Sequence, residues 1–216
     1  MAGQAVGILD LTQGELGTRG SAAMRYEEAQ NAAKVMGVKV RENVRMADGF
    51  FRNDEEHLRL LIPYIRHYMP DIVIANALSD RHPDHGRGGR LIADACFFSG
   101  LRKIATAWQG VAQEPWRPKR VYHMIQDRLV EPTFIVDITG TFEKKMEAIR
   151  CYRSQFHDPA SEEPVTYIAT ENFLNQIAYK DVITGKKIGV DYAEGFISEN
   201  IPGISSLDDL MLPELP

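Results

Sequence analysis

The sequence predicts an α/β fold, a Rossmann-like three-layer sandwich with a mostly parallel sheet. Short apolar segments of strand length alternate with longer amphipathic segments of helix length along most of the chain. This alternation is typical of βαβ units, which join parallel strands through right-handed crossovers. The 216 residues, of which 44% are hydrophobic and 25% charged, are enough to bury a core. We therefore expect one domain over residues 1–216.

The expected elements follow one another in a regular order. Strands are expected over residues 5–11, 38–44, 71–77, 120–126 and 133–139, and helices over residues 21–37, 53–69, 88–100 and 141–156. Ser21 and Gly37 are typical residues at the start and the end of the first helix. Asn53 with Glu56 predicts the N-terminal cap of the second helix, and Pro70 ends it.

The strand at 71–77 is a continuous apolar run, which predicts burial on both faces. It is followed by the loop sequence His-Pro-Asp-His, residues 82–85, and then by a helix. In open α/β sheets, ligands bind outside the carboxyl ends of the strands. The Gly-rich loop at 14–22 follows another strand and should border the same edge. We expect residues 157–216 to pack over this edge.

Composition excludes several classes of function. The net charge is −5 and no basic block is present, which argues against nucleic acid or an anionic membrane surface as a partner. No apolar run approaches the roughly 20 residues of a membrane-spanning helix. Cys96 and Cys151 lie in apolar, helix-like stretches and are interpreted as buried thiols, so a reducing cytoplasm is the expected compartment. Neither a G-x-S-x-G elbow nor a Walker-type loop is present.

His82 and His85 are the only two of the six histidines that lie so close together in the chain. A catalytic zinc site needs about three protein ligands and an open position for water, and this pair could supply one or two of them. Asp84 could hydrogen-bond an imidazole and fix its tautomer. In the opposing interpretation, Asp80 or Asp84 caps the next helix and the histidines are solvated bystanders. The spacing alone gives the two interpretations about equal weight.

Several separated motifs together resemble the PIG-L/LmbE-type zinc N-deacetylases. They are "ILDLTQGELGTRGSAAMRYEEAQNAAKVMGV", "DRHPDHGRGGRL", "YRSQF" and "GVDYAEGF", and they fall in the family's order from about Val6 to Phe196. The chain looks most like the bacterial branch that deacetylates N-acetylglucosaminyl-malate in bacillithiol synthesis. The resemblance implies a Rossmann-like domain that hydrolyses an N-acetyl amino sugar to a free amine and acetate.

The resemblance also implies roles for individual residues. His85 corresponds to a metal ligand of the family, with Zn²⁺ as the expected ion and another divalent metal as the alternative. His82 corresponds to the catalytic histidine, whose protonated ring stabilises the tetrahedral oxyanion or protonates the leaving amine, with Asp84 holding the ring. The residues implied to bind substrate are Arg25, Tyr192, Arg19 and Gln155. The expected partner is a small N-acetyl amino sugar, and a homo-oligomer remains open.

One part of the family pattern has no counterpart. These enzymes carry a His-Pro-Asp-Asp motif after their first strand, which supplies two metal ligands and the general base. The His-Pro-Asp at residue 82 belongs to the later motif instead. We therefore expect the natural protein to begin upstream of Met1, with the first five residues, including Gly3 as a C-cap, ending a helix. The DNA preceding the Met1 codon tests this expectation.

Three functions from different classes remain open at this stage. The first is a zinc N-deacetylase represented by a shortened sequence. The second is an inactive remnant of the same fold that binds a sugar or a partner subunit. The third is a metal-free α/β hydrolase or transferase in which His82 is the acid or base, and its activity would survive chelators.

Overall fold

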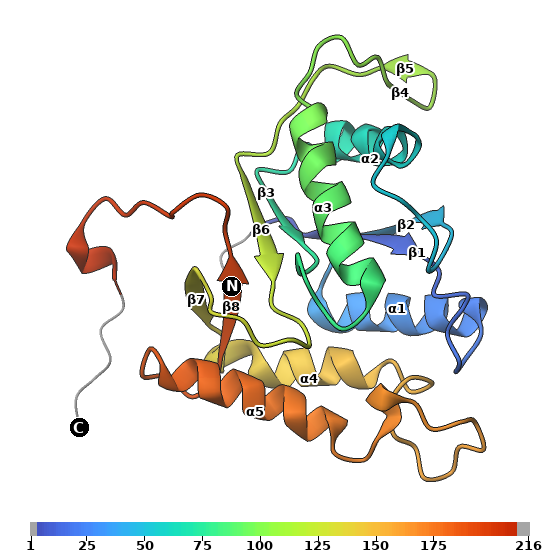
Figure 1. Ribbon diagram of the computed structural model, residues 1–216, viewed down its shortest axis with the longest axis vertical. Coiled ribbons are helices and arrows are strands. Elements are labelled where there is room, and N and C mark those ends of the chain that lie inside the picture. Colours follow the sequence, from blue (N-terminus) through green and yellow to red (C-terminus); the bar gives the residue numbers. More distant parts are fainter. Residues whose placement is uncertain (1–3, 211–216) are drawn as a thin grey trace. The chain divides into compact units, whose positions relative to one another are not determined.

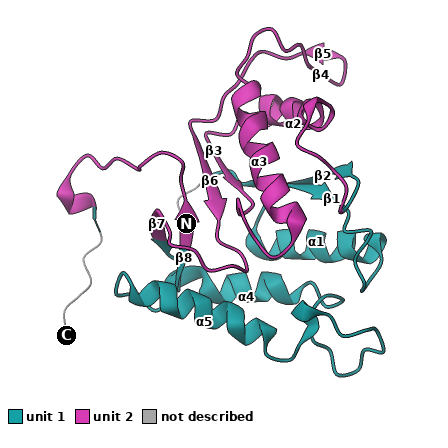
Figure 2. Cartoon of the chain, in the orientation of Figure 1, with its two compact units in different colours: residues 1–48, 136–194, 210–216 teal, residues 49–135, 195–209 magenta. Residues whose placement is uncertain are grey.

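The computed structural model describes residues 4–210, which divide into two compact units (Figure 2). The first unit comprises residues 1–48, 136–194 and 210–216, and the second comprises residues 49–135 and 195–209. The N-terminal residues that were expected to end a helix, Gly3 among them, lie largely outside the described residues. Within the described ranges, no helix has both the length and the apolar character needed to cross a membrane.

The first unit is built on a parallel strand pair and three helices (Figure 1). Strand β1 pairs with β2 in parallel register, with Gly7 opposite Val40. Helix α1 packs against α4, and their buried side chains include Ala32 and Met146. The elements of this unit are β1 (Gly7–Thr12), α1 (Ala22–Met36), β2 (Val40–Met46), α4 (Phe142–Arg150) and α5 (Phe173–Lys186).

The second unit also centres on a parallel pair. Strand β3 pairs with β6, and β6 pairs with β8 in antiparallel fashion, within a sheet of order β3-β6-β8-β7. Helices α2 and α3 pack against each other, and Leu61, Ile62 and Leu91 are almost fully buried. The elements are α2 (Glu55–Tyr68), β3 (Ile72–Ala75), α3 (Pro83–Phe98), β4 (Ala107–Trp108), β5 (Val111–Ala112) and β6 (Arg120–Met124). The residues of β7 (Phe134–Asp137) and β8 (Ala193–Ile197) are divided between the two units.

The sequence predicted α1 correctly at both ends. The Ser21 side chain accepts a hydrogen bond from the backbone N–H of Met24 at 3.2 Å. Gly37 adopts the left-handed conformation, with φ of 72°, and its N–H bonds to the carbonyl groups of Ala33 and Lys34. Such a C-cap favours glycine because a Cβ is disfavoured at positive φ. The parallel pairing of the predicted strands is also confirmed.

Other expectations about individual elements are wrong. Asp54, not Asn53, caps α2, because the Asn53 amide donates to Asp94 at 2.6 Å. Strand β3 is not buried on both faces, since Ile72 and Ile74 are exposed in a unit where α3 packs on the strand. Helix α3 begins at Pro83, so most of the supposed His-Pro-Asp-His loop is helical.

The C-terminal part of the chain contains structure that the sequence did not predict. Helix α4 ends at Arg150, six residues early, because the backbone after it takes part in tertiary hydrogen bonds. The segment expected to be irregular holds the short hairpin β4–β5, with a turn at Gln109 and Gly110 where φ is positive at both residues. Helix α5 and strand β8 were not predicted at all.

Candidate functional site

His82 is the N-terminal cap of α3, at the carboxyl end of β3. Its Nδ1 accepts a hydrogen bond from the backbone N–H of Asp84 at 3.3 Å, and Pro83 occupies the first turn, where a proline is favourable. An Nδ1 that accepts must be unprotonated, so in the neutral ring the proton is on Nε2. His82 therefore presents an N–H donor away from the helix. The capping interpretation was correct about a cap, but the histidine forms it, not Asp80 or Asp84.

A buried carboxylate contacts Nδ1 of His85 and fixes the orientation of its ring. Its Nδ1 lies 2.5 Å from Oδ2 of Asp80, whose side chain is fully buried. The other oxygen of Asp80 accepts from the backbone N–H groups of Asp127 and Arg128. Burial alone would raise the pKa of Asp80, but the hydrogen bonds from His85 and from backbone N–H groups outweigh it and lower that pKa. A carboxylate that accepts from Nδ1 leaves the Nε2 lone pair of His85 free for a ligand.

The two imidazoles lie side by side. Their ring centroids are 5.4 Å apart and the rings are tilted by 41°. The arrangement depends on two glycines of α3 that lie against the preceding loop. A Cβ at Gly89 would lie 2.6 Å from the carbonyl oxygen of Asn76, and one at Gly86 would lie 2.9 Å from that of Leu78. The helix start is thus packed directly on backbone, which fixes the position of both rings.

Asp84 does not orient the His82 ring through its side chain, contrary to the expectation. Its carboxylate accepts hydrogen bonds from the backbone N–H of Gly49 at 2.8 Å and from Nη1 of Arg87 at 2.7 Å. Only the backbone N–H of Asp84 contacts the ring of His82. The reason is local: a carboxylate in the first turn of a helix is near the side chain three residues on, and here that side chain is Arg87.

The donor set for a metal is incomplete in the described part of the chain. His85, with Asp80 behind it, has the arrangement of a metal-ligating histidine. Within residues 4–210, however, no group of three or more His, Cys, Asp or Glu side chains could hold a metal ion. These residues therefore fit one ligand of the expected Zn²⁺ site and not a complete coordination sphere.

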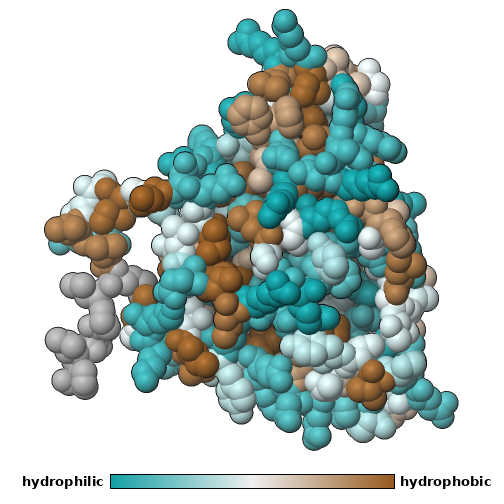
Figure 3. All heavy atoms as spheres, in the orientation of Figure 1, coloured by the Kyte–Doolittle hydropathy of each residue, from teal (hydrophilic) through white to brown (hydrophobic). Residues whose placement is uncertain are grey.

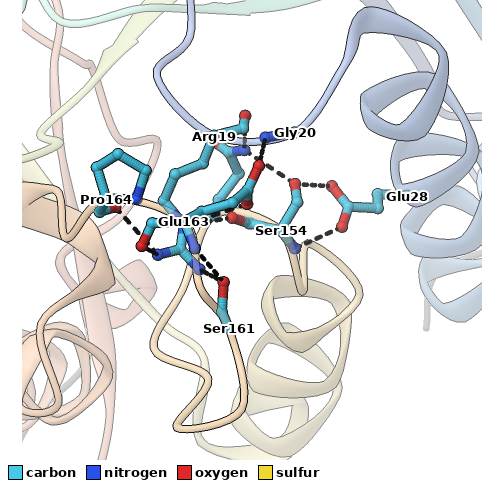
Figure 4. Close-up of polar contacts among 8 residues, drawn as sticks. Arg19, Gly20, Glu28, Ser154, Ser161, Glu163 and Pro164 are labelled. Atoms are coloured by element: carbon cyan, nitrogen blue, oxygen red, sulfur yellow. Dashed lines mark hydrogen bonds and ion pairs between the residues drawn. The ribbon is translucent and has the colours of Figure 1, made fainter.

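Arg19 and Gln155 are engaged in a buried network of the first unit. Figure 4 shows Arg19 in this network, close to Ser154 and Ser161. Arg19 is 4% exposed, and its guanidinium donates to Ser154 O at 2.7 Å and to the Ser161 hydroxyl at 3.0 Å. The Gln155 amide donates to Arg19 O and to the Ser154 hydroxyl, which in turn donates to Glu28. Because these donors already have partners, the geometry supports a structural role for both residues.

Arg25 differs from Arg19 in having an unsatisfied donor. Its Nε is buried and has no hydrogen-bond partner among the described residues. Its guanidinium lies against the Gly-rich loop, where a Cβ at Gly14 would be 2.9 Å, and one at Gly17 3.1 Å, from Nη1. Gly14 also has a φ of 67°. The two glycines therefore leave the space in which the Arg25 guanidinium lies.

The Gly-rich loop is itself braced by two carboxylates that the sequence analysis missed. The Asp48 side chain accepts from the Thr12 hydroxyl at 3.2 Å and from the N–H of Leu16 at 3.1 Å. The Glu15 side chain accepts from the N–H of Asp48 at 2.8 Å. No local sequence pattern predicts a hydrogen bond between residues more than 30 positions apart in the chain. Asp80 was missed as the partner of His85 for a related reason, since its role depends on how the loop folds.

Tyr192 packs on an aromatic ring. It stacks on Phe142 with a centroid distance of 3.6 Å and an interplanar angle of 5°. The predicted substrate-binding residues Arg19, Arg25, Gln155 and Tyr192 all belong to the first unit, whereas His82, Asp84 and His85 belong to the second. The structure thus groups the histidines with one another and groups Arg19 with Gln155.

Cys151 is only partly buried, contrary to the expectation of two buried thiols. Cys96 is buried, and burial raises its pKa to about 12. A thiol with so high a pKa is a poor nucleophile at neutral pH.

Two curated proteins are similar to this chain. Diacetylchitobiose deacetylase of Thermococcus kodakarensis is 28% identical over 201 residues, which are 92% of this chain and 70% of that protein. The 4-oxalmesaconate hydratase of Pseudomonas putida is 31% identical over 140 residues, 62% of this chain, and the chain spans only about half (51%) of its length.

Two solved structures share the fold. A conserved protein of Thermus thermophilus, TT1542, superposes with a TM-score of 0.82 and 30% identity, over 95% of this chain and 86% of that one. The N,N′-diacetylchitobiose deacetylase of Pyrococcus horikoshii, complexed with its inhibitor MPG, gives a TM-score of 0.74 and 28% identity, over 89% of this chain and 72% of that one. The predicted α/β fold is thereby confirmed.

The family model described as PIG-L: GlcNAc-PI de-N-acetylase matches residues 1–96, a range that includes the Gly-rich loop, Arg25 and both histidines of α3. The order of these motifs, the geometry of the imidazole pair and the similarity to TT1542 over nearly the whole chain agree with that match. The chain belongs to the PIG-L family.

Proposed function

We propose that the protein is a metal-dependent N-deacetylase, an amide hydrolase that removes the acetyl group of an N-acetylglucosamine conjugate. The observation that carries this proposal is the pair of imidazoles at the start of α3. His82 presents an Nε2–H donor, and His85 presents a free Nε2 lone pair with Asp80 behind it. The similarity to two diacetylchitobiose deacetylases supports the substrate class.

His82 acts on the oxygen of the scissile amide. Water adds to the acetyl carbonyl, the C–N bond breaks, and the products are acetate and a free amine. In this conformation Nδ1 of His82 is occupied by the N–H of Asp84, so the ring contributes a hydrogen bond from Nε2 to the tetrahedral oxyanion. Protonation of the leaving amine by the same ring would require an imidazolium, which cannot accept the Asp84 N–H. Oxyanion stabilisation is therefore the role that the geometry favours.

His85 would hold the metal, with Zn²⁺ as the proposed ion. A bound divalent ion polarises a carbonyl group and lowers the pKa of a coordinated water. Asp80 keeps the Nδ1 proton of His85 in place, so that Nε2 is the coordinating atom. Because the described residues do not complete a coordination sphere, we assign no further ligand.

Arg25 and Tyr192 are proposed to contact the substrate. Arg25 has a buried Nε without a partner among the described residues, and a guanidinium suits sugar hydroxyls or a carboxylate. This chemistry is compatible with the malate group of N-acetylglucosaminyl-malate, the substrate that we propose in bacillithiol synthesis. We propose the cytoplasm as the compartment and leave self-association open.

The test is acetate release by the purified protein supplied with Zn²⁺. N,N′-Diacetylchitobiose and N-acetylglucosaminyl-malate are the two substrates, and we expect turnover that a chelator abolishes. His85→Ala should lose bound metal, measured by elemental analysis, as well as activity. His157→Ala is the matched control, because His157 is exposed and has no described side-chain partner. Its metal content and activity should equal those of the wild type.

Two outcomes would contradict the proposal. Binding of either sugar with neither zinc nor turnover would identify this chain as a binding-only member of the fold. Turnover that survives chelators would point to metal-free chemistry at His82.

A second candidate function is hydration, favoured by the 31% identity to the Pseudomonas hydratase. Water addition to 4-oxalmesaconate, followed by its absorbance, distinguishes this function from deacetylation.

A further inference from the structure

The second unit contains a separate pocket at the base of the β4–β5 hairpin. It has a volume of about 460 Å³, within the range typical of small-molecule sites. Its lining comes from the end of α2, from the hairpin and from the segment that follows the hairpin. Helix α3, 16 residues long, begins at the imidazole pair and ends near the base of the hairpin. At 1.5 Å per residue, α3 is about 24 Å long.

The walls of the pocket are held in place by hydrogen bonds inside the protein. The Gln113 amide donates to Pro63 O at 2.9 Å, and the Trp116 indole donates to Pro70 O at 2.9 Å. Trp108 stacks on His67, with a centroid distance of 4.2 Å and an interplanar angle of 8°. A ligand would therefore meet a surface that is already ordered, which lowers the entropic cost of binding.

Two polar side chains of the lining, Gln113 and Glu114, offer acceptors. Since a carbonyl oxygen can only accept, the contact with Pro63 O fixes the Gln113 amide with its nitrogen toward that oxygen. Gln113 lines the pocket, and its Oε1 is buried and has no donor among the described residues. Glu114 adds a carboxylate to the lining. A buried acceptor without a donor is unfavourable, and a hydroxyl or amine of a ligand would satisfy it.

The one arginine of the pocket is not available to an anion. Arg66 is 5% exposed, and its guanidinium donates to Ser99 O, Leu101 O and Ile104 O, and to the Thr106 hydroxyl. These bonds engage all three nitrogens. The charge of Arg66 is therefore already used within the protein.

Apolar and aromatic side chains make up most of the remaining surface. Trp108 and Trp116 both line the pocket, together with Met69, Val111, Ala112 and Pro115. Figure 3 shows hydrophobic side chains interspersed with hydrophilic ones on one face of the molecule. Val111 is 70% exposed and Met69 is 55% exposed. The electron-rich face of an indole attracts the polarised C–H groups of a saturated ring as well as cations.

From this combination we propose that the pocket is a carbohydrate-binding site that takes one pyranose unit, either a neutral hexose or a hexosamine. The C–H face of the sugar ring packs on the indoles, and a hydroxyl donates to Gln113 Oε1. An amine on a hexosamine would in addition lie close to Glu114. This site does not depend on the proposed deacetylation, since it uses none of the residues of the imidazole pair.

Intrinsic fluorescence tests the site directly, because Trp108 and Trp116 are the only two tryptophans of the chain. The protein is titrated with glucose, glucosamine and N-acetylglucosamine, with tetramethylammonium and inorganic phosphate as separate arms. We expect saturable changes with the sugars and none with phosphate. Gln113→Met should weaken sugar binding about tenfold, the effect of one lost hydrogen bond. Gln176→Met, at an exposed position of α5, should leave it unchanged.

Trp108→Phe keeps an aromatic ring and leaves Trp116 as the reporter, so it separates loss of stacking area from loss of fold. It should bind sugar more weakly while its thermal unfolding stays cooperative. The proposal is overturned if no sugar changes the fluorescence of the wild type, or if Gln113→Met and Trp108→Phe both bind as well as the wild type. It is also overturned if only tetramethylammonium binds. Acetate release is measured in parallel, and its loss or presence does not affect this conclusion.

Discussion

The imidazole pair of α3 and the Arg19 network show how similar-looking candidates differ in the folded protein. His82 and His85 each use one ring nitrogen for the protein, and their Nε2 atoms have no partner that the described hydrogen bonds assign. Arg19 and Gln155 are buried and donate to several partners inside their own unit. A polar residue that keeps an unused atom can act on a ligand, whereas one whose atoms are all engaged stabilises the fold.

The sharpest test of this comparison separates the two roles of His82. His82→Ala should lower acetate release by about 10² to 10³-fold, the effect of removing one oxyanion donor. It should also lower the free energy of unfolding by about 1 kcal/mol, because the cap of α3 is lost. His82→Asn restores a capping oxygen and should recover the stability but not the activity. Recovery of both by asparagine would show that His82 is only a cap.

For the buried network, the expected effect is on stability. Arg19→Met leaves several carbonyl groups and the Ser161 hydroxyl without a donor, and should lower the free energy of unfolding by about 3 kcal/mol. Urea unfolding measures the change. Arg153→Met, at an exposed position, is the control and should change stability by less than about 0.5 kcal/mol. An Arg19→Met protein that is as stable as the wild type but binds substrate more weakly would show that Arg19 belongs to the substrate site.

Arg25 is intermediate between the imidazole pair and the Arg19 network, because it is buried but keeps one donor without a described partner. The substitution Gly17→Ala tests whether Arg25 contacts the substrate. A Cβ at Gly17 would lie 3.0 Å from Gly14 O and 3.1 Å from Arg25 Nη1. Gly17→Ala should therefore displace the guanidinium and raise the KM of deacetylation about fivefold, roughly 1 kcal/mol, with little change in kcat. Gly140→Ala meets nothing within 4 Å and is the matched control. An unchanged KM in Gly17→Ala would separate Arg25 from substrate binding.

The smallest expected effect concerns Asp181, a fully buried carboxyl group of the first unit that forms an ion pair with Lys145. Burial raises its pKa, against the lowering effect of Lys145. An acid whose pKa is raised on folding contributes stability that is present below its unfolded value, about 3.9, and is lost as the pH rises through the folded pKa. Asp181→Asn should therefore gain stability relative to the wild type, within about 1 kcal/mol, as the pH rises from about 4 through the folded pKa of Asp181. Thermal unfolding at several pH values measures this difference. A difference between variant and wild type that does not change with pH would contradict it.

Local chemistry allowed some of these features to be predicted from sequence. The ends of α1 follow from Ser21 and Gly37, and the place of His82 follows from the rule that ligands gather at the carboxyl ends of strands. The partners of those residues did not follow. Which carboxylate faces His85, and which backbone groups Arg19 contacts 135 residues away, depend on tertiary folding that no spacing encodes.

Gly86 and Gly89 have a consequence for any attempt to change the specificity of this site. Because α3 lies directly on the backbone of the preceding loop at these positions, a larger residue there would push the helix and both imidazoles outward together. A library that randomises the residues around the histidines should therefore keep these two glycines constant. Exposed positions of α3 such as Arg90 are as close in sequence to the histidines. Substitutions there would not move the imidazole rings.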